Sequence, residues 1–167
     1  DHHETEAVAA AKRYGAVLAS HDDTTEGQVK VSAGYGISMA EFPTTLEAAR
    51  ACHTHDIPVI MGAPNLIRGG SHSGNVAAHD LAEAGYLDIL SSDYVPAALL
   101  LAAVSLSEQW DDWAKGLATV TYNPARAVGL DDRGEIAIGK RADLIQFAMR
   151  GGAPALRSVW SKGARVA

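Results

Sequence analysis

The chain has 167 residues, of which 47% are hydrophobic and 20% charged, and its formal net charge is −6. This size and composition are typical of one soluble globular domain with an apolar core. The acidic charge argues against a broad nucleic-acid surface, and no apolar run approaches the roughly 18 residues that span a bilayer. We therefore expect neither nucleic acid nor a membrane as a partner. The single cysteine, Cys52, favours a reducing, cytoplasmic location.

Short apolar runs alternate with helical patterns over most of the chain. Helical spacing predicts helices over residues 4–14, 26–33, 46–55, 76–84 and 97–107. The apolar runs cover residues 16–21, 37–42, 57–61 and 87–93. Because these runs are continuously apolar and a helix separates each from the next, they indicate an α/β fold with a parallel sheet.

The pattern changes near residue 110. Residues 110–127 form a mixed helical stretch, and residues 132–147 combine turns with β-rich runs, which predicts a small β unit. A last strand pair is expected around Lys162 and Gly163. We therefore predict a helix-covered part at residues 1–127 and a β segment at residues 128–167.

The segment 61–75 is predicted to be a long loop between a strand and a helix. Loops that only connect such elements have roughly 2–6 residues. This one contains Arg68, hydroxyl and amide side chains, and glycines whose N–H groups would converge on an anion. Asn75 is expected to cap the helix that follows. A mobile surface loop is the alternative interpretation.

Every predicted strand is followed by side chains that can do chemistry. These are His21, Glu41, Asn65 with Arg68, and Asp93. In (β/α)8 barrels the active site is built at the carboxyl ends of the strands. Four βα units make only half of such a barrel, and a typical barrel needs about 250 residues.

Two groups of motifs resemble a known family. Residues 119–130, 133–136 and 139–144 resemble the C-terminal part of the amidohydrolase superfamily. Residues 20–23, 41–45, 62–65, 68–75 and 88–96 resemble the PhnM family of the bacterial C–P lyase pathway, the α-D-ribose 1-methylphosphonate 5-triphosphate diphosphatases. The resemblance implies that the chain is the C-terminal half of a (β/α)8 barrel, strands 5–8, plus part of a small β-sandwich. The missing N-terminal half would then be a partner needed for activity.

The resemblance also implies a divalent metal site, with zinc, manganese and magnesium left open. Asp93 would bind the metal and act as general base toward water, and His21 would be a further ligand. Glu41 would bind the metal or only orient its neighbours. From the residues alone, Asp93 could equally cap a helix, and His21 could be a hydrogen-bonded histidine at a strand end.

For the substrate, the resemblance implies a polyphosphate-binding segment. Its members would be Asn65, Arg68, Gly69, Gly70, Ser71, Ser73 and Asn75. His72 would bind the polyphosphate, protonate the leaving pyrophosphate or approach the metal.

The function expected from the resemblance is hydrolysis of the 5-triphosphate of a ribose 1-phosphonate to the 5-phosphate and pyrophosphate. One alternative is an amidohydrolase acting on a C–N bond, as a deacetylase, deaminase or cyclic amidase. The other is a half-barrel that only binds or assembles. Unpaired sheet edges would also allow a homo-oligomer.

Overall fold

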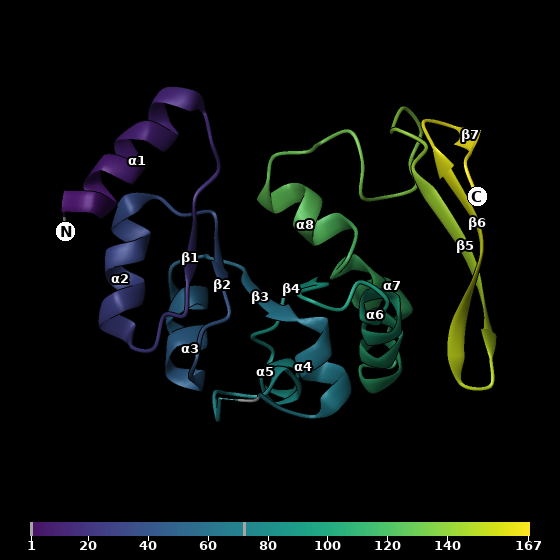
Figure 1. Cartoon of the computed structure of the whole chain (residues 1–167), viewed down its shortest axis with the longest axis horizontal. Helices are drawn as coiled ribbons and strands as arrows, with labels where there is room; N and C mark the ends of the chain where they lie inside the picture. Colours follow the sequence, from purple (N-terminus) through teal and green to yellow (C-terminus); the bar gives the residue numbers. More distant parts are fainter. Residues whose placement is uncertain (1, 72) are drawn as a thin grey trace.

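A computed structural model describes residues 2–71 and 73–167 of the chain. These residues form a four-stranded parallel sheet covered by helices, followed by a three-stranded antiparallel sheet (Figure 1). The α/β class and the parallel sheet agree with the sequence-based prediction. That the four strands are strands 5–8 of a barrel, and that a boundary lies at residue 128, stay predictions.

The elements follow one another along the chain in the predicted alternation. The helices are α1 (His2–Tyr14), α2 (Glu26–Tyr35), α3 (Leu46–Thr54), α4 (Ala63–Arg68), α5 (Ala78–Ala84), α6 (Ala98–Gln109), α7 (Trp113–Ala118) and α8 (Tyr122–Ala127). The strands are β1 (Ala19–His21), β2 (Met39–Glu41), β3 (Val59–Gly62), β4 (Ile89–Ser91), β5 (Leu144–Arg150), β6 (Ala153–Ser161) and β7 (Ala164–Arg165).

The parallel sheet has the order β1-β2-β3-β4, and its two faces bury different side chains. Ala40, Val59 and Leu90 belong to the main core, which also contains buried residues of α2 to α6. Met39, Ile60 and Ile89 form a second cluster against α8. Helices α2 to α6 accordingly lie along one side of the sheet and α8 on the other (Figure 1). Because both faces of β3 are covered, all four of its residues are buried.

Two threonines begin the helices that follow β1 and β2. Thr25 accepts a hydrogen bond from the N–H of Gln28, whose side chain accepts from the N–H of Thr25 in return. Thr45 accepts from the N–H of Ala48 in the same way at α3. Such side-chain oxygens satisfy amides that have no carbonyl partner within the helix. The predicted helix starts in these two loops are confirmed.

Part of the predicted long loop is helical, so that prediction was wrong for residues 63–68. Pro64 lies in the first turn of α4, where its fixed φ suits a helix and its missing N–H costs nothing. Gly69 ends the helix with φ +77, a left-handed conformation that favours glycine. A proline at the start and a glycine at the end were the available signals for this short helix.

The predicted β unit is also shifted along the chain, because residues 132–143 contain no strand and strands begin at Leu144. Ile136 and Ile138, which lie in the β-rich run expected between two turns, are 90% and 105% exposed. Ion pairs hold this segment instead: Arg126 pairs with Asp131, and Glu135 lies 3.3 Å from the ammonium group of Lys140. The predicted last strand pair is confirmed, since β6 and β7 flank Lys162 and Gly163.

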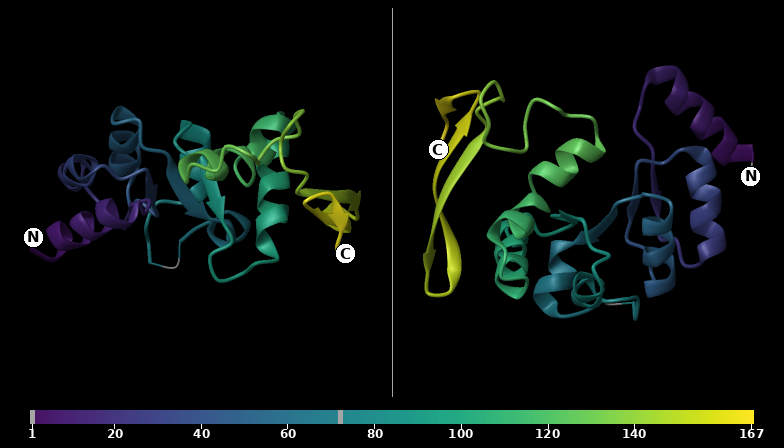
Figure 2. Two further views of the ribbon diagram at one scale, coloured as in Figure 1. Left: turned by 90° about the horizontal axis from the view of Figure 1, so that it is seen from above. Right: turned by 180° about the vertical axis from the view of Figure 1, so that it is seen from behind.

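The antiparallel sheet lies at the opposite end of the molecule from α1 in every view (Figures 1 and 2). Its strand β6 contacts α6. Among the described residues, every helix is too short or too polar to cross a membrane.

Candidate functional site

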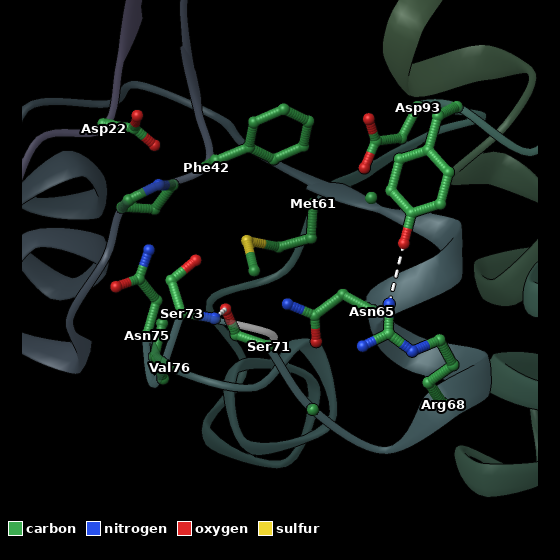
Figure 3. A pocket seen from close by; sticks show the side chains of 14 residues that line it. Asp22, Phe42, Met61, Asn65, Arg68, Ser71, Ser73, Asn75, Val76 and Asp93 are labelled. Carbon is green, nitrogen blue, oxygen red and sulfur yellow. Dashed lines mark hydrogen bonds between the residues drawn. The ribbon is translucent and has the colours of Figure 1, made fainter.

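An open cavity of about 190 Å³ lies at the carboxyl ends of the parallel strands. The loops after β1 to β4 all contribute to its wall (Figure 3). The lining residues are Asp22, Phe42, Pro43, Met61, Gly62, Asn65, Arg68, Gly70, Ser71, Ser73, Asn75, Val76, Asp93 and Tyr94. Small-ligand pockets commonly measure roughly 300–1,000 Å³, so this cavity would hold one part of a nucleotide-sized molecule.

Asp93 lies on the wall of the cavity, directly over Gly62. A Cβ atom built on Gly62 would lie 2.8 Å from Asp93 Oδ2, closer than real contacts allow. Asp93 itself has φ +48, in the left-handed region. Asp and Asn enter this region more readily than most side chains. Two features therefore position this carboxylate: the absence of a side chain at Gly62, and the left-handed backbone conformation of Asp93 after β4.

The only arginine among the described lining residues is Arg68, at the end of α4. Its Nη1 donates a hydrogen bond of 2.7 Å to the hydroxyl oxygen of Tyr94, marked by the dashed line in Figure 3. This contact joins the end of α4 to the loop after β4. It brings a cation and a phenol to the rim of the cavity, on the same side as Asp93.

His21 and Glu41 are neighbours because β1 and β2 pair them in register. His21 Nδ1 lies 3.1 Å from Asp22 Oδ2, and Nε2 lies 4.0 Å from Glu41 Oε2. The Phe42 ring packs edge-on to the imidazole, with 5.3 Å between centroids. A proton on Nδ1 that is donated to Asp22 leaves Nε2 as an acceptor facing a carboxylate, an arrangement that fits a cation.

The three predicted metal ligands are not brought together as one group. Within residues 2–71 and 73–167, no three His, Cys, Asp or Glu side chains are placed to hold a metal ion. His21 and Glu41 form a pair, whereas Asp93 lies over Gly62 at the other side of the cavity. In Figure 3, Asp22 and Asp93 flank the cavity from opposite sides. The donor chemistry of the His21–Glu41 pair fits a divalent ion, and the third ligand stays a prediction.

Gly70, Ser71, Ser73, Asn75 and Val76 line the cavity, but the backbone N–H groups of Gly69 and Gly70 are already used. The N–H of Gly69 bonds to the carbonyl of Leu66, and the N–H of Gly70 bonds to that of Asn65. We predicted that these two N–H groups would converge on an anion. That prediction is wrong, because both N–H groups donate to carbonyl groups at the C-terminal end of α4. Gly70 still lines the cavity.

The polar side chains of this segment reach the cavity from one side. Ser71, Ser73 and Asn75 line it together, and Ser71 Oγ accepts a hydrogen bond of 3.2 Å from the N–H of Ser73. His72, the predicted acid or polyphosphate ligand, lies outside the described residues. The predicted cap at Asn75 is also wrong, since the first N–H of α5 bonds to the Asn65 side chain.

Backbone hydrogen bonds connect the loops after β1, β2 and β3. The N–H of Thr44 bonds to the carbonyl of Asp23, and the carbonyl of Thr44 accepts from the N–H of Val76, each at 2.9 Å. The Thr44 and Thr24 hydroxyls lie 2.8 Å apart in a further bond. The three loops are therefore held together in one layer above the sheet.

Sequence reasoning gave no role to three residues of this site: Gly62, Phe42 and Tyr94. Their positions did carry a signal, because each lies at or just after the carboxyl end of a strand. The closeness of Gly62 to Asp93 has no local signal, since it depends on how β3 and β4 pair.

Known proteins resemble the chain over nearly its whole length. The sequence model of the amidohydrolase family matches residues 5–166. A curated relative from Escherichia coli (strain K12), alpha-D-ribose 1-methylphosphonate 5-triphosphate diphosphatase, is 49% identical over 165 residues, which cover 96% of this chain. The chain spans 44% of that relative's length.

Solved structures share the fold. An amidohydrolase from Thermotoga maritima MSB8 superposes with a TM-score of 0.69 at 20% identity, covering 91% of this chain and 43% of its own. N-acetylglucosamine-6-phosphate deacetylase from Pasteurella multocida gives a TM-score of 0.66 at 16% identity, covering 97% and 53%. At such identities the likeness concerns the fold alone. The match of the family model over residues 5–166 shows that this chain belongs to the amidohydrolase family.

Proposed function

We propose that the chain carries part of the active site of a diphosphatase of phosphonate catabolism. The substrate would be α-D-ribose 1-methylphosphonate 5-triphosphate, hydrolysed in the cytoplasm to the 5-phosphate and pyrophosphate. The identity of 49% to the Escherichia coli diphosphatase is the observation that carries this proposal. The cavity supports it, because a carboxylate and a set of phosphate-compatible donors face each other across it.

In this reaction Asp93 takes the role of general base. A carboxylate oxygen of Asp93 accepts a proton from the water that attacks a phosphorus of the triphosphate. Arg68 and Tyr94 lie beside it, and a guanidinium fork matches the oxygens of a phosphate group. Ser71, Ser73 and Asn75 add uncharged polar groups on the opposite wall.

We further propose that His21 and Glu41 hold a divalent ion, with Asp93 as a third ligand. Such an ion lowers the pKa of a bound water toward neutrality and offsets the charge of a polyphosphate. Asp22 would then fix the imidazole through Nδ1, leaving Nε2 free for the ion.

The parallel sheet would be half of a (β/α)8 barrel, strands 5–8, with residues 128–167 as a separate β segment. β1 is an outer strand of the sheet. The N–H of Leu90 in the other outer strand, β4, already bonds to the carbonyl of Thr119. Since the chain spans 44% of the relative, we propose that strands from the remaining part pair with the sheet and complete the cavity.

The test combines this chain with the part of the Escherichia coli relative that it does not cover. Release of pyrophosphate from the ribose triphosphate is measured for the wild type and for Asp93→Asn. The variant is expected to be slower by roughly 10²-fold or more, because it lacks the base. Asp111→Asn is the matched control, since Asp111 is exposed, has φ +49 and lies outside the cavity.

Three results would contradict the proposal. Release of ammonia or acetate from C–N substrates without pyrophosphate release would favour another amidohydrolase reaction. Equal rates for Asp93→Asn and Asp111→Asn would remove Asp93 from the mechanism. Activity that survives exhaustive chelation would exclude the divalent ion.

A further inference from the structure

Helix α5 begins without a capping side chain of its own. Its N-cap residue is Ala77, and the first helical residue, Ala78, is completely buried. A buried N–H without an acceptor would cost about 1–3 kcal/mol. The N–H of Ala78 meets this need by donating a 3.0 Å hydrogen bond to Asn65 Oδ1, from a residue 13 positions earlier.

This bond fixes which way the Asn65 amide faces. Because Oδ1 must point toward the N–H of Ala78, the Nδ2 group must point away from α5. Figure 3 shows that nitrogen directed toward the cavity, which Asn65 lines. Nδ2 carries two hydrogens and accepts none. Among the described residues, no acceptor takes a hydrogen bond from it.

The backbone of Asn65 holds the other end of the same segment. Its carbonyl accepts the N–H of Gly70 at 3.0 Å, while its side chain accepts the N–H of Ala78. Asn65 therefore bonds to Gly70 and to Ala78, which lie before and after the cavity-lining Ser71, Ser73 and Asn75 in the sequence. The bond from the N–H of Val76 to the carbonyl of Thr44 attaches this segment to the neighbouring loop as well.

We propose that Asn65 is a positioning residue whose side-chain amide oxygen and nitrogen have two different roles. Its oxygen holds α5 and thereby the wall formed by Ser71, Ser73 and Asn75. Its nitrogen is kept as a hydrogen-bond donor toward a phosphate oxygen of the bound polyphosphate. The role of the nitrogen as a donor rests on the proposed function, whereas the positioning role of the oxygen rests on the contacts of Asn65 alone.

Two substitutions separate the positioning role of the amide oxygen from the donor role of the amide nitrogen. Asn65→Asp keeps an oxygen for the N–H of Ala78 but replaces the donor by a carboxylate. Asn65→Ala removes both groups. The readouts are hydrogen exchange of the Ala78 amide in the ligand-free chain, and binding of inorganic pyrophosphate, measured by calorimetry, to the chain combined with the remaining part of the Escherichia coli relative.

For Asn65→Asp we expect wild-type exchange at Ala78 and a dissociation constant for pyrophosphate raised roughly tenfold or more. That change corresponds to the loss of one hydrogen bond to a charged group. For Asn65→Ala we expect faster exchange at Ala78 together with weaker binding. The comparison of Ile67→Asp with Ile67→Asn measures the effect of a carboxylate placed on α4 outside the cavity, which we expect to stay within roughly twofold.

Unchanged exchange at Ala78 in Asn65→Ala would overturn the positioning role. Wild-type affinity for pyrophosphate in Asn65→Asp, or no pyrophosphate binding by the completed wild-type protein, would overturn the donor role. The exchange measurement uses no substrate and no activity. A failure of the proposed diphosphatase function would therefore leave its result standing.

Discussion

At the scale of single residues, the site depends on a glycine that has no reactive group. Gly62 has φ −72, which alanine adopts without strain, and the nearest obstacle to a new Cβ atom is the side chain of Asp93. We expect Gly62→Ala to displace that carboxylate and to slow pyrophosphate release roughly tenfold or more. Steady-state kinetics of the completed protein measure this effect.

The control for this substitution is Gly34→Ala, whose new Cβ would meet no atom within 4 Å. It is expected to keep wild-type activity. If both alanine variants are equally active, the contact between Gly62 and Asp93 has no part in catalysis.

Cys52 gives a second expectation for a single side chain. It is fully buried in α3, and burial, with the nearby charge of Asp23, raises the pKa of its thiol from 9.0 to about 11. The folded chain therefore keeps this proton where the unfolded chain loses it, and the free energy of unfolding falls as the pH rises from about 9 to about 11. Denaturant titrations over this range should show a shallower decline for Cys52→Ala. Equal slopes would contradict the shift.

Residue-level prediction worked where a side chain follows directly from its strand. His21, Glu41 and Asp93 were placed at strand ends by the apolar pattern, and His21 and Glu41 are indeed neighbours. The pattern could not show that Asp93 lies apart from them, because that depends on the spacing and twist of the whole sheet. Nor could it show the bond from Ala78 to Asn65, because these residues lie 13 positions apart in the sequence.

At the scale of elements, α2 offers a direct measure of how much one cap contributes. Thr25 and Gln28 exchange hydrogen bonds at its start, at 3.3 Å and 3.0 Å. We expect Thr25→Ala to lower the free energy of unfolding by about 1 kcal/mol. Thr25→Ser keeps the oxygen and should restore most of the loss. If the serine variant has the same free energy of unfolding as the alanine variant, the methyl group of Thr25 and not its capping oxygen stabilises the helix.

Elements were predictable where local signals agreed. Threonine caps defined the starts of α2 and α3, and Gly36 defined the end of α2, because these residues satisfy or release the backbone locally. Helix α4 was missed since six residues are too few for a periodic apolar face. The strand expected at Ile136 and Ile138 was wrong because a strand requires a partner, and ion pairs on α8 hold that segment in turns.

At the scale of the whole molecule, the open edge of the parallel sheet at β1 is the feature that we expect to determine self-association. In the described part of the chain, β1 has β2 as its strand neighbour and its other edge carries none. Unpaired edges recruit other strands, and a lysine on the edge opposes this. We expect the chain to self-associate at rising concentration and Ala19→Lys to shift it toward monomer, as measured by sedimentation velocity.

Ala9→Lys is the matched control, because it adds the same charge at an exposed position of α1. It should associate like the wild type. A wild-type chain that stays monomeric, or a control that behaves like Ala19→Lys, would show that this edge does not drive association.

The sheet class was predictable because continuous apolar strands separated by helices have few other solutions. The position of the antiparallel sheet was not, since β6 reaches the rest of the molecule mainly through α6 and no sequence pattern encodes that contact.

The hydrogen bonds that run from Asp23 through Thr44 to Val76 also restrict how the loops around the cavity can be redesigned. Thr44 commits both its N–H and its carbonyl to neighbouring loops, so none of the three loops can gain or lose a residue near these bonds independently. A single loop transplanted from a relative would carry backbone N–H groups that have no matching carbonyl acceptor in the neighbouring loops. Substrate preference is therefore best altered by exchanging the three loops as a set, or by side-chain substitutions that leave their lengths unchanged.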